Sequence, residues 1–356
     1  MPLSVGRAPR ASLRGFAPLA GLEAGVMAGL ISVMPLVVYR ALGDAALASK
    51  LYFAVGAVSM LAGFMVPWLT RFVPRRWMYS GGVCLYLLGA TLAIAGGPTL
   101  TALALLSNAI GTATIFVCFN AYILDYVARN DLGRSQSTQM FYAATAWTAG
   151  PVAGVWLLGV WQPLPFLLAA GFAVALLVAF WRLRLGNGKE IQRARGPAPN
   201  PMAYLGHFMR QPRLVAGWLF AVVRSCGWWV YVVYLPIFCI ESGLGDKVGG
   251  TMLSASNMLL FSAPLMLRLV YRVKVRTSVV AAFLVGGLAF CLAYPASAWP
   301  WATVALLVAS SVCLVMLDVA GGLPVLMAGK TSETHRIGGV YFIVRDRPGH
   351  LTPGAA

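Results

Sequence analysis

The chain has 356 residues, of which 60% are hydrophobic and 10% are charged, and its formal net charge is +17. Because an average soluble domain is about 25% charged, this composition excludes a soluble enzyme, a disordered chain and a hydrated nucleic-acid-binding module. Apolar runs of about 20 residues, each long enough to cross a hydrocarbon core of about 30 Å, recur along the chain. The sequence therefore predicts an all-α polytopic membrane protein in a lipid bilayer, with no nucleic-acid partner.

Ten membrane-spanning helices are predicted, in two unequal groups separated by a long polar segment. The predicted spans are 16–39, 51–70, 78–96, 99–125, 138–160, 163–184, 214–240, 248–270, 278–296 and 299–327. Residues 185–213 have the Pro- and Arg-rich composition of a cytoplasmic linker. Within it we expect a membrane-surface helix, because Met202, Leu205, Phe208 and Met209 share one helical face. We therefore expect an N-terminal six-helix half over residues 1–184 and an incomplete C-terminal half with four spans over residues 214–356.

The basic residues indicate how these spans are oriented. Of the 27 Lys and Arg residues, all but four fall on the side of the N-terminus. The exceptions are Arg40, Lys50 and Lys247 on the opposite side and Arg224 inside a span. Because cytoplasmic loops carry an excess of Lys and Arg, we expect a cytoplasmic N-terminus and a multi-pass protein of the bacterial inner membrane.

An internal repeat supports the division into halves. Four residues that follow the second span recur 197 positions later, after the eighth span: Pro67, Arg71, Val73 and Arg75 correspond to Pro264, Arg268, Val270 and Arg272. Parallel repeats of six spans are one construction of transporters. By this symmetry the second half stops inside its fifth helix, so we expect a chain that is truncated after the tenth span. The alternative is that the residues after this span form a cytoplasmic tail.

Charged residues inside predicted spans are costly and mark functional sites. Glu23 lies in the first span, Asp125 at the end of the fourth, Arg224 in the seventh and Asp318 in the tenth. These are the first and fourth spans of each half, so we expect them to line one central polar cavity. Arg224 keeps its charge and needs an anionic partner or ligand, for which Asp318 is the candidate. Glu23 and Asp318 are the candidates for proton coupling, and the alternative for Glu23 is a structural carboxyl.

Aromatic and amide side chains extend the predicted polar site. Trp228, one turn after Arg224, and Tyr231 are candidates for lining the substrate, and an aromatic belt at the membrane interface is the alternative. Asn108 and Asn120 in the fourth span are also candidates for substrate binding. Hydrogen bonding between helices is the alternative for both asparagines.

Asp125 has two candidate partners near the cytoplasmic interface. It precedes Arg129 by four residues, a spacing that allows an ion pair on one helix. Alternatively, Asp125 forms a gating latch with Arg71 or Arg75, which follow the second span.

Motifs for catalysis or cofactor binding are lacking. The three histidines are scattered, and Gly329-Lys330-Thr331 lacks the first glycine of a phosphate-binding loop, because Pro324 takes its position. No cluster of carboxylates offers the oxygen ligands that Mg²⁺ requires. We therefore expect no enzyme activity, no cofactor and no metal site.

After the second span the sequence resembles the major facilitator superfamily of secondary transporters. The signature of that family at this place runs G-x-L-a-D-R-x-G-R-R, and residues 67–76 read PWLTRFVPRR, which keeps the leucine and the two closing arginines. Both glycines are replaced by proline and the aspartate by Arg71. The segment Gly150-Pro151-Val152-Ala153-Gly154 resembles part of the antiporter signature of the family, G-P-x-x-G.

The resemblance covers residues 15–356 and implies the family fold, with two six-helix halves and both termini in the cytoplasm. It also implies that the arginine contact of the family with a carboxylate on the fourth helix survives as Arg75 with Asp125. The first hypothesis is therefore a secondary transporter of a small organic solute by alternating access, coupled to protons, with export by antiport favoured. The alternative is a non-transporting truncated membrane protein, such as a ligand-sensing or partner-binding remnant.

Overall fold

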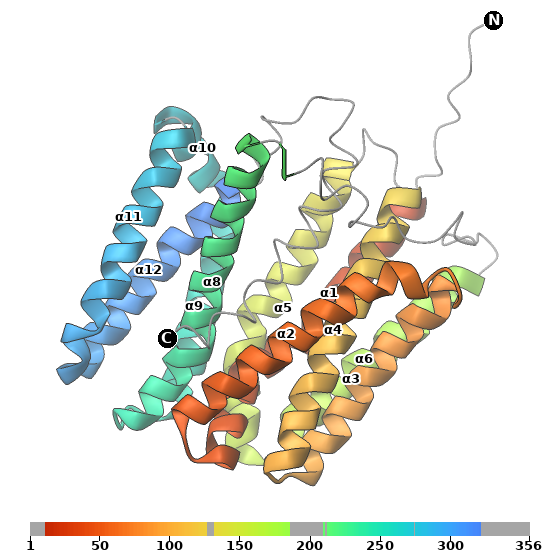
Figure 1. The fold of residues 1–356 in the computed structure, drawn as a ribbon, viewed down its shortest axis with the longest axis horizontal. Coiled ribbons are helices and arrows are strands. Elements are labelled where there is room, and N and C mark those ends of the chain that lie inside the picture. Colours follow the sequence, from red (N-terminus) through yellow and green to blue (C-terminus); the bar gives the residue numbers. More distant parts are fainter. Residues whose placement is uncertain (1–10, 127–131, 186–208, 211, 274, 322–356) are drawn as a thin grey trace, which may run out of the picture.

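The computed structural model describes residues 11–126, 132–185, 209–210, 212–273 and 275–321, and the regular elements in these ranges are helices (Figure 1). The first group is α1 (Ala11–Leu42), α2 (Ala45–Leu69), α3 (Arg75–Ala95), α4 (Pro98–Tyr126), α5 (Leu132–Val160) and α6 (Leu164–Leu185). The second group is α8 (Pro212–Glu241), α9 (Asp246–Met258), α10 (Ala263–Val273), α11 (Val275–Ala293) and α12 (Pro300–Gly321). The predicted all-α fold class is confirmed.

Nine helices in the described ranges are long and apolar enough to cross a membrane. The predicted eighth span, 248–270, does not form one such helix, because the chain divides there into α9, a 3-10 turn over Leu259–Ser262 and α10. Pro264, in the first turn of α10, has no N–H to donate to the carbonyl of Leu260. The prediction of one continuous helix through this point is therefore wrong.

Three sequence predictions fall wholly or largely outside the described residues. They concern the linker 185–213, the end of the tenth span beyond Gly321, and the truncated helix that follows it. Arg129, one of the two candidate partners of Asp125, also lies outside them.

The turn between α1 and α2 shows how the local sequence sets helix boundaries. Gly43 has a φ of +69°, which an L-residue with a side chain rarely adopts, and its N–H donates to the carbonyl of Tyr39 at 2.8 Å. Asp44 follows, and its Oδ1 accepts from the N–H of Ala46 at 2.8 Å. A glycine C-cap and an aspartate N-cap therefore end one span and begin the next within three residues.

The buried side chains form two hydrophobic clusters. The larger cluster is built from α1–α6, and the smaller one from α8, α9, α11 and α12. Helix α8 contributes to both, because Val233 and Ile237 belong to the larger cluster whereas Tyr231 and Leu235 belong to the smaller one. Through α8 the second group of helices therefore packs into the core of the first.

Helix α5 packs against both α1 and α9 and so joins the two groups. A Cβ atom at Gly150 of α5 would lie 2.4 Å from the Cβ of Ala28 on α1. A Cβ atom at Gly250 of α9 would lie 2.9 Å from the carbonyl oxygen of Pro151. Small residues on both sides therefore let three backbones approach closely, as is usual where membrane helices pack.

Two hydrogen bonds cross the same junction at the proline of α5. Pro151 has no N–H, so the ladder of α5 is interrupted in this turn. Ser32 Oγ of α1 donates to the carbonyl of Pro151 at 2.8 Å, and Ser254 Oγ of α9 accepts from the N–H of Val152 at 2.9 Å. Serine side chains from both neighbouring helices therefore satisfy backbone groups that lack water in a bilayer.

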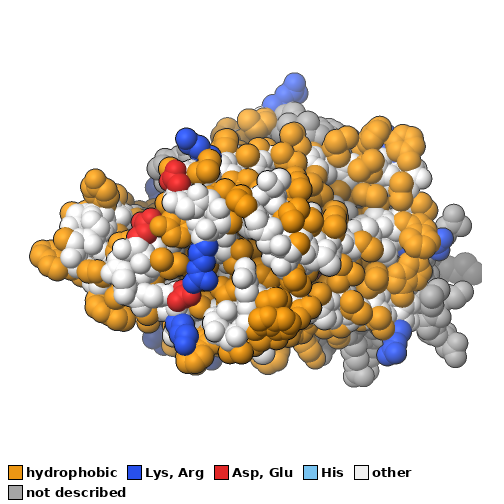
Figure 2. All heavy atoms as spheres, turned by 90° about the horizontal axis from the view of Figure 1, so that it is seen from below, with side chains coloured by type: hydrophobic (Ala, Val, Ile, Leu, Met, Phe, Trp, Pro, Cys, Tyr) orange, Lys and Arg blue, Asp and Glu red, His pale blue; other side chains and the backbone are white. Residues whose placement is uncertain are grey.

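Hydrophobic side chains also cover the outside of the bundle. Leu61, Phe72, Leu265 and Leu284 are each at least 60% exposed, and such residues contact acyl chains in a membrane. Seen from the end where the α1–α2 and α8–α9 turns lie, charged side chains are few and of both signs (Figure 2).

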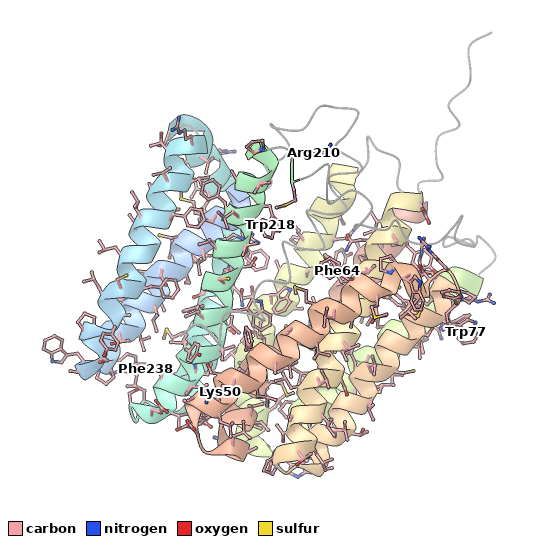
Figure 3. The ribbon with its side chains drawn as sticks, viewed as in Figure 1. Lys50, Phe64, Trp77, Arg210, Trp218 and Phe238 are labelled. Carbon is pink, nitrogen blue, oxygen red and sulfur yellow. The ribbon has the colours of Figure 1, made fainter. Side chains whose placement is uncertain are left out.

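The side-chain view supports the predicted sidedness of the loops. Lys50 and Arg210 lie at opposite ends of the bundle, and Trp77 projects from its outer edge (Figure 3). This is the arrangement that the predicted topology requires, with Lys50 on one side of the membrane and Arg210 on the other.

The glycine packing of α5 predicts a position-dependent effect of adding one methyl group. We expect Gly150→Ala to lower the free energy of unfolding by about 1–3 kcal/mol, because its Cβ would overlap the backbone and Cβ of Ala28. Gly171→Ala in α6 is the control, since a Cβ there meets nothing within 4 Å. Thermal unfolding of both variants in detergent measures the difference. Equal melting temperatures would contradict the packing role of Gly150.

Candidate functional site

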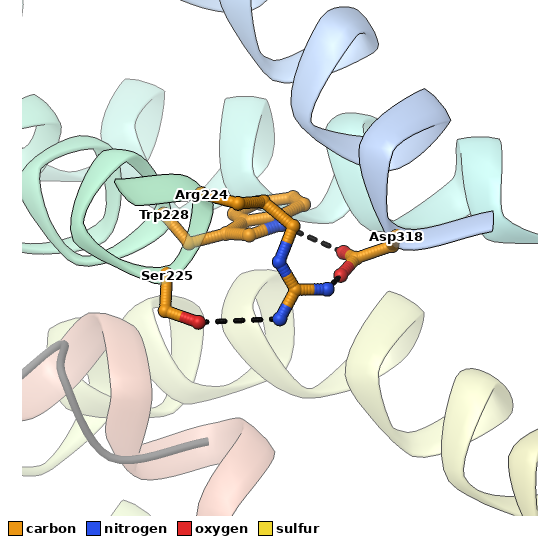
Figure 4. Close-up of polar contacts among 4 residues, drawn as sticks. All are labelled: Arg224, Ser225, Trp228 and Asp318. Atoms are coloured by element: carbon orange, nitrogen blue, oxygen red, sulfur yellow. Dashed lines mark hydrogen bonds and ion pairs between the residues drawn. The ribbon is translucent and has the colours of Figure 1, made fainter. Parts of the chain in front are cut away.

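A charged cluster lies between α8 and α12 (Figure 4). Arg224 Nη1 forms an ion pair with Asp318 Oδ1, and Trp228 Nε1 donates to Asp318 Oδ2 at 2.7 Å. Arg224 Nη2 also donates to Ser225 Oγ at 3.2 Å. Because Trp228 follows Arg224 by one helical turn, both donors face the same carboxylate. The pair that the sequence indicates, Arg224 with Asp318, is thus formed in the structure.

The cluster pairs a buried positive charge with a partly exposed negative one. The side chain of Arg224 is 7% exposed and that of Asp318 is 26% exposed. A buried guanidinium is tolerated in a membrane when a carboxylate pairs with it. The arrangement therefore places Arg224 against a protein partner and not against an open cavity.

A cavity of about 130 Å³ lies elsewhere, where α8 meets the first group of helices. Its walls come from four helices, α1, α2, α4 and α8. The lining residues are Met27, Leu30, Ile31, Met34, Pro35, Tyr52, Ser59, Leu105, Asn108, Ala109, Thr112, Ala113, Phe116 and Trp229. No charged residue is among them.

Helical periodicity explains which faces line the cavity. On α1 the lining residues follow one another at intervals of three and four, from Met27 through Leu30 and Ile31 to Met34. On α4 they do the same from Leu105 to Phe116. Residues three and four apart lie on one face of a helix, so each helix presents a single stripe. Trp229 of α8 completes the wall from the second group.

The polar side chains of the cavity fall into two kinds. Ser59 Oγ donates to the carbonyl of Ala109 at 2.9 Å, and Thr112 Oγ1 donates to the carbonyl of Asn108 at 2.8 Å. By contrast, the side-chain oxygen and nitrogen of Asn108 and the hydroxyl of Tyr52 are buried without a hydrogen-bond partner in the described part of the chain. Unpaired polar atoms at this depth are rare in proteins.

Some of the predicted site residues lie in the cavity, some in the Arg224–Asp318 cluster, and some in contacts within or between helices. Asn108 lines the cavity, whereas Asn120 Nδ2 donates to the carbonyl of Phe116 at 2.9 Å, a bond within α4. Tyr231 is 1% exposed, and its hydroxyl lies 2.6 Å from Ser256 Oγ in the packing of α8 against α9. Trp228 faces Asp318.

Glu23 occupies a third place, on α1 within the first group. Its side chain is partly exposed, and no ion pair or hydrogen bond joins it to another described residue. The carboxyl is therefore not committed to a basic partner, unlike that of Asp318.

Two of the three candidate latch residues, Arg75 and Asp125, meet where α3 begins and α4 ends. Arg75 Nη1 forms an ion pair with Asp125 Oδ2 at 2.6 Å, and its guanidinium lies 5.1 Å from the ring centroid of Tyr122. Arg71 is exposed and forms no ion pair with any residue in the described ranges. Of the two arginines considered at the sequence level, Arg75 therefore makes the contact.

Contacts between the two groups gather at the opposite end of the molecule. Arg40 Nη2 lies 2.5 Å from Asp246 Oδ2, and the Tyr39 hydroxyl donates to Glu241 Oε1 at 3.1 Å. Ser49 of α2 is hydrogen-bonded to the hydroxyl of Tyr234 of α8. These residues join α1 and α2 to α8 and α9, and sequence reasoning did not single them out. Charged residues on both sides of one short turn, such as Glu241 and Asp246, were the available signal.

Sequence reasoning also missed most of the cavity. Tyr52, Thr112 and Trp229 were not predicted as site residues, although all three line it. One signal was available on α4, where Asn108, Thr112 and Phe116 follow one another at intervals of four and so share a face.

Comparisons with known proteins decide the family. The sequence profile of the Major Facilitator Superfamily matches residues 16–353, which is nearly the whole chain. The chain belongs to the major facilitator superfamily. The predicted resemblance to this family is thereby confirmed. Comparison with curated protein sequences gives no match.

Solved structures of transporters share the fold. The peptide transporter POT in complex with sulfate has a TM-score of 0.74 and 15% identity, over 96% of this chain and 87% of that chain. A mutant of the nucleoside transporter NupG has a TM-score of 0.70 and 10% identity, over 96% and 90%. A bacterial homologue of the human lysosomal transporter Spinster, inward-facing and unoccupied, has a TM-score of 0.68 and 14% identity, over 98% and 82%. Family and fold are those of multi-pass membrane transporters.

Breaking the buried Arg224–Asp318 pair is predicted to destabilise the protein more than breaking the exposed Arg40–Asp246 pair. Asp318→Asn leaves Arg224 charged and buried without its counter-ion, so we expect the free energy of unfolding to fall by about 3–5 kcal/mol. The control is Asp246→Asn, whose pair with Arg40 is exposed at 36% and 52% and is expected to contribute about 0–1 kcal/mol. Thermal unfolding in detergent measures both variants. Adding Arg224→Met to Asp318→Asn should restore stability, and a further loss in the double variant would contradict the pairing.

Proposed function

We propose that this protein is a proton-linked secondary transporter of a small organic solute, which works by alternating access. The observation that carries the proposal is the cavity where α8 of the second group meets α1, α2 and α4 of the first. A site at the junction of two helical groups changes its access when the groups rock against each other. The family and the fold support this function.

The distribution of contacts supports a direction for the rocking motion. We assign the end with Arg40, Lys50 and Lys247 to the outside of a bacterial inner membrane, because the other end carries nearly all basic residues. At the outer end, Arg40–Asp246 and Tyr39–Glu241 join the two groups. The other two ion pairs of the described residues, Arg75–Asp125 and Arg224–Asp318, each lie within one group. The structure is therefore consistent with a state that is closed to the outside.

Glu23 is our candidate for the proton carrier. It lies inside a membrane span without a basic partner among the described residues. A carboxyl in this position is neutral when protonated and charged when not, so its protonation changes how the surrounding helices pack. Asp318 is the second candidate, and protonation would release Arg224 and Trp228 from it. In this scheme Tyr231 supports the cluster by fixing α8 to α9.

The latch and the antiporter-like segment complete the proposal. Arg75–Asp125 ties α3 to α4 at the inner end, so it holds the first group together while the groups move. The segment Gly150–Gly154 lies against α1 and α9, where a change in packing alters the contact between the groups. Its resemblance to the antiporter signature supports export in exchange for protons.

Proton coupling is tested by Glu23→Gln, which keeps the shape of the side chain and removes the titratable group. In proteoliposomes with a pH-sensitive dye inside, we expect solute-dependent proton movement to disappear in this variant. Asp44→Asn is the matched control, because Asp44 is exposed at the N-cap of α2 and asparagine caps equally well. Undiminished proton movement in Glu23→Gln, with the control behaving as the parent, would exclude Glu23 as the carrier.

A further inference from the structure

The lining of the cavity restricts the charge of what can enter it. Moving an ion into an apolar site without a counter-charge or hydrogen-bond partners carries a large desolvation cost. None of the fourteen lining residues is charged. Arg224, Asp318 and Glu23 all lie outside the lining, and the first two already pair with each other. The cavity therefore favours an uncharged ligand or an uncharged part of one.

Two lining side chains offer polar atoms that nothing in the described chain satisfies. Asn108 on α4 is 6% exposed and Tyr52 on α2 is 3% exposed. The amide oxygen, the amide nitrogen and the tyrosine hydroxyl all lack a hydrogen-bond partner in the described residues. A group buried in this way loses its bonds to water without replacement, so a ligand that supplies the missing partner recovers that loss.

The Asn108 amide lies against Gly89 of α3. A Cβ atom at Gly89 on α3 would lie 2.5 Å from Asn108 Oδ1 and 3.1 Å from Nδ2. The amide therefore occupies the space that the glycine leaves empty. Asn108 also lies on the lining face of α4, so its amide reaches a ligand in the cavity by rotating about its side-chain bonds away from α3.

The remaining walls suit a flat apolar group. Met27 provides a thioether, and Phe116 and Trp229 provide aromatic rings. Thioethers and aromatic rings both contact aromatic rings favourably. The volume of about 130 Å³ is close to the ~150 Å³ of an engineered apolar cavity that binds benzene. A phenyl-sized group is thus the scale of ligand that this state accommodates.

We propose that the cavity binds an uncharged solute that combines a phenyl-sized apolar group with a neutral amide or hydroxyl. Asn108 and Tyr52 recognise the neutral polar group, and the apolar walls hold the ring. This inference rests on the proposed function in one respect, namely that the cavity is the transport site. It narrows the substrate class, because organic anions and cations are excluded from the cavity.

Three probes of similar size and different charge test the inference. Calorimetric titration of the full-length protein in lipid nanodiscs compares benzamide, benzoate and benzylammonium. We expect saturable binding of benzamide at a single site, with the two ions at least ~10-fold weaker. Absence of saturable benzamide binding, or equal or tighter binding of either ion, would overturn the inference.

Variants of the two polar residues test the recognition itself. Asn108→Leu keeps the approximate size of the side chain and should weaken benzamide binding about tenfold, as expected for one lost hydrogen bond to a buried partner. Tyr52→Phe should weaken it in the same direction. Tyr79→Phe is the matched control, because the Tyr79 hydroxyl is also buried without a partner but does not line the cavity. Unchanged affinity in both lining variants would contradict the proposed recognition.

Melting temperature, benzamide affinity and proton movement are measured separately, so that effects on folding, binding and transport can be distinguished. Asn108→Leu removes an unpaired buried amide, so its melting temperature should not fall, and a folded variant without affinity supports the inference. Binding of benzamide without proton movement would leave the inference intact and remove the proposed function. Proton-linked flux for which only charged solutes compete would support the proposed function and overturn the inference about an uncharged ligand.

Discussion

The close approach of α5 to α1 on one side and to α9 on the other determines how the two groups of helices meet. Gly150 leaves no room for a side chain against Ala28, and Gly250 leaves none against Pro151. Because the contacts involve backbone atoms, they set the spacing of the helices and not only that of side chains. The spacing of α1 from α8, and with it the cavity between them, depends on this junction.

The placement of the ion pairs follows the free-energy cost of removing charged side chains from water. Among the described residues two arginines are buried, Arg75 and Arg224, and each has a carboxylate within the same group of helices. The pair that joins the groups, Arg40–Asp246, is exposed. Exposed pairs contribute little to stability and are easily exchanged for water, whereas buried pairs are costly to break. This division suits a molecule in which each group of helices moves as a rigid body. The buried ion pairs, which are costly to break, lie within a group, and the exposed pair, which is easily broken, lies between the groups.

The order of the spans was predictable from the sequence because hydrophobic length and loop charge are local properties. The pairing of Arg224 with Asp318 was predictable because a guanidinium in a membrane needs a counter-ion and few carboxylates lie in spans. The break between α9 and α10 was missed, since a hydropathy pattern does not register the backbone hydrogen bond that Pro264 removes.

The cavity was missed for another reason. The faces of α1, α4 and α8 that line the cavity depend on how each packed helix is rotated about its own axis. The residue pattern of one helix alone does not determine that rotation. Tyr231 shows the same limit, because its hydroxyl bonds to Ser256 in the interior of the second group.

The central claim is that the two groups move against each other at their outer end and that Glu23 controls the motion. Spin labels at Leu47 on α2 and Thr251 on α9, both exposed near that end, report their separation by pulsed electron resonance in nanodiscs, after replacement of the native cysteines. The account predicts two populations of distance whose ratio changes with pH, and a single pH-independent distribution in Glu23→Gln. One distribution that is unchanged with pH in the parent protein would contradict it.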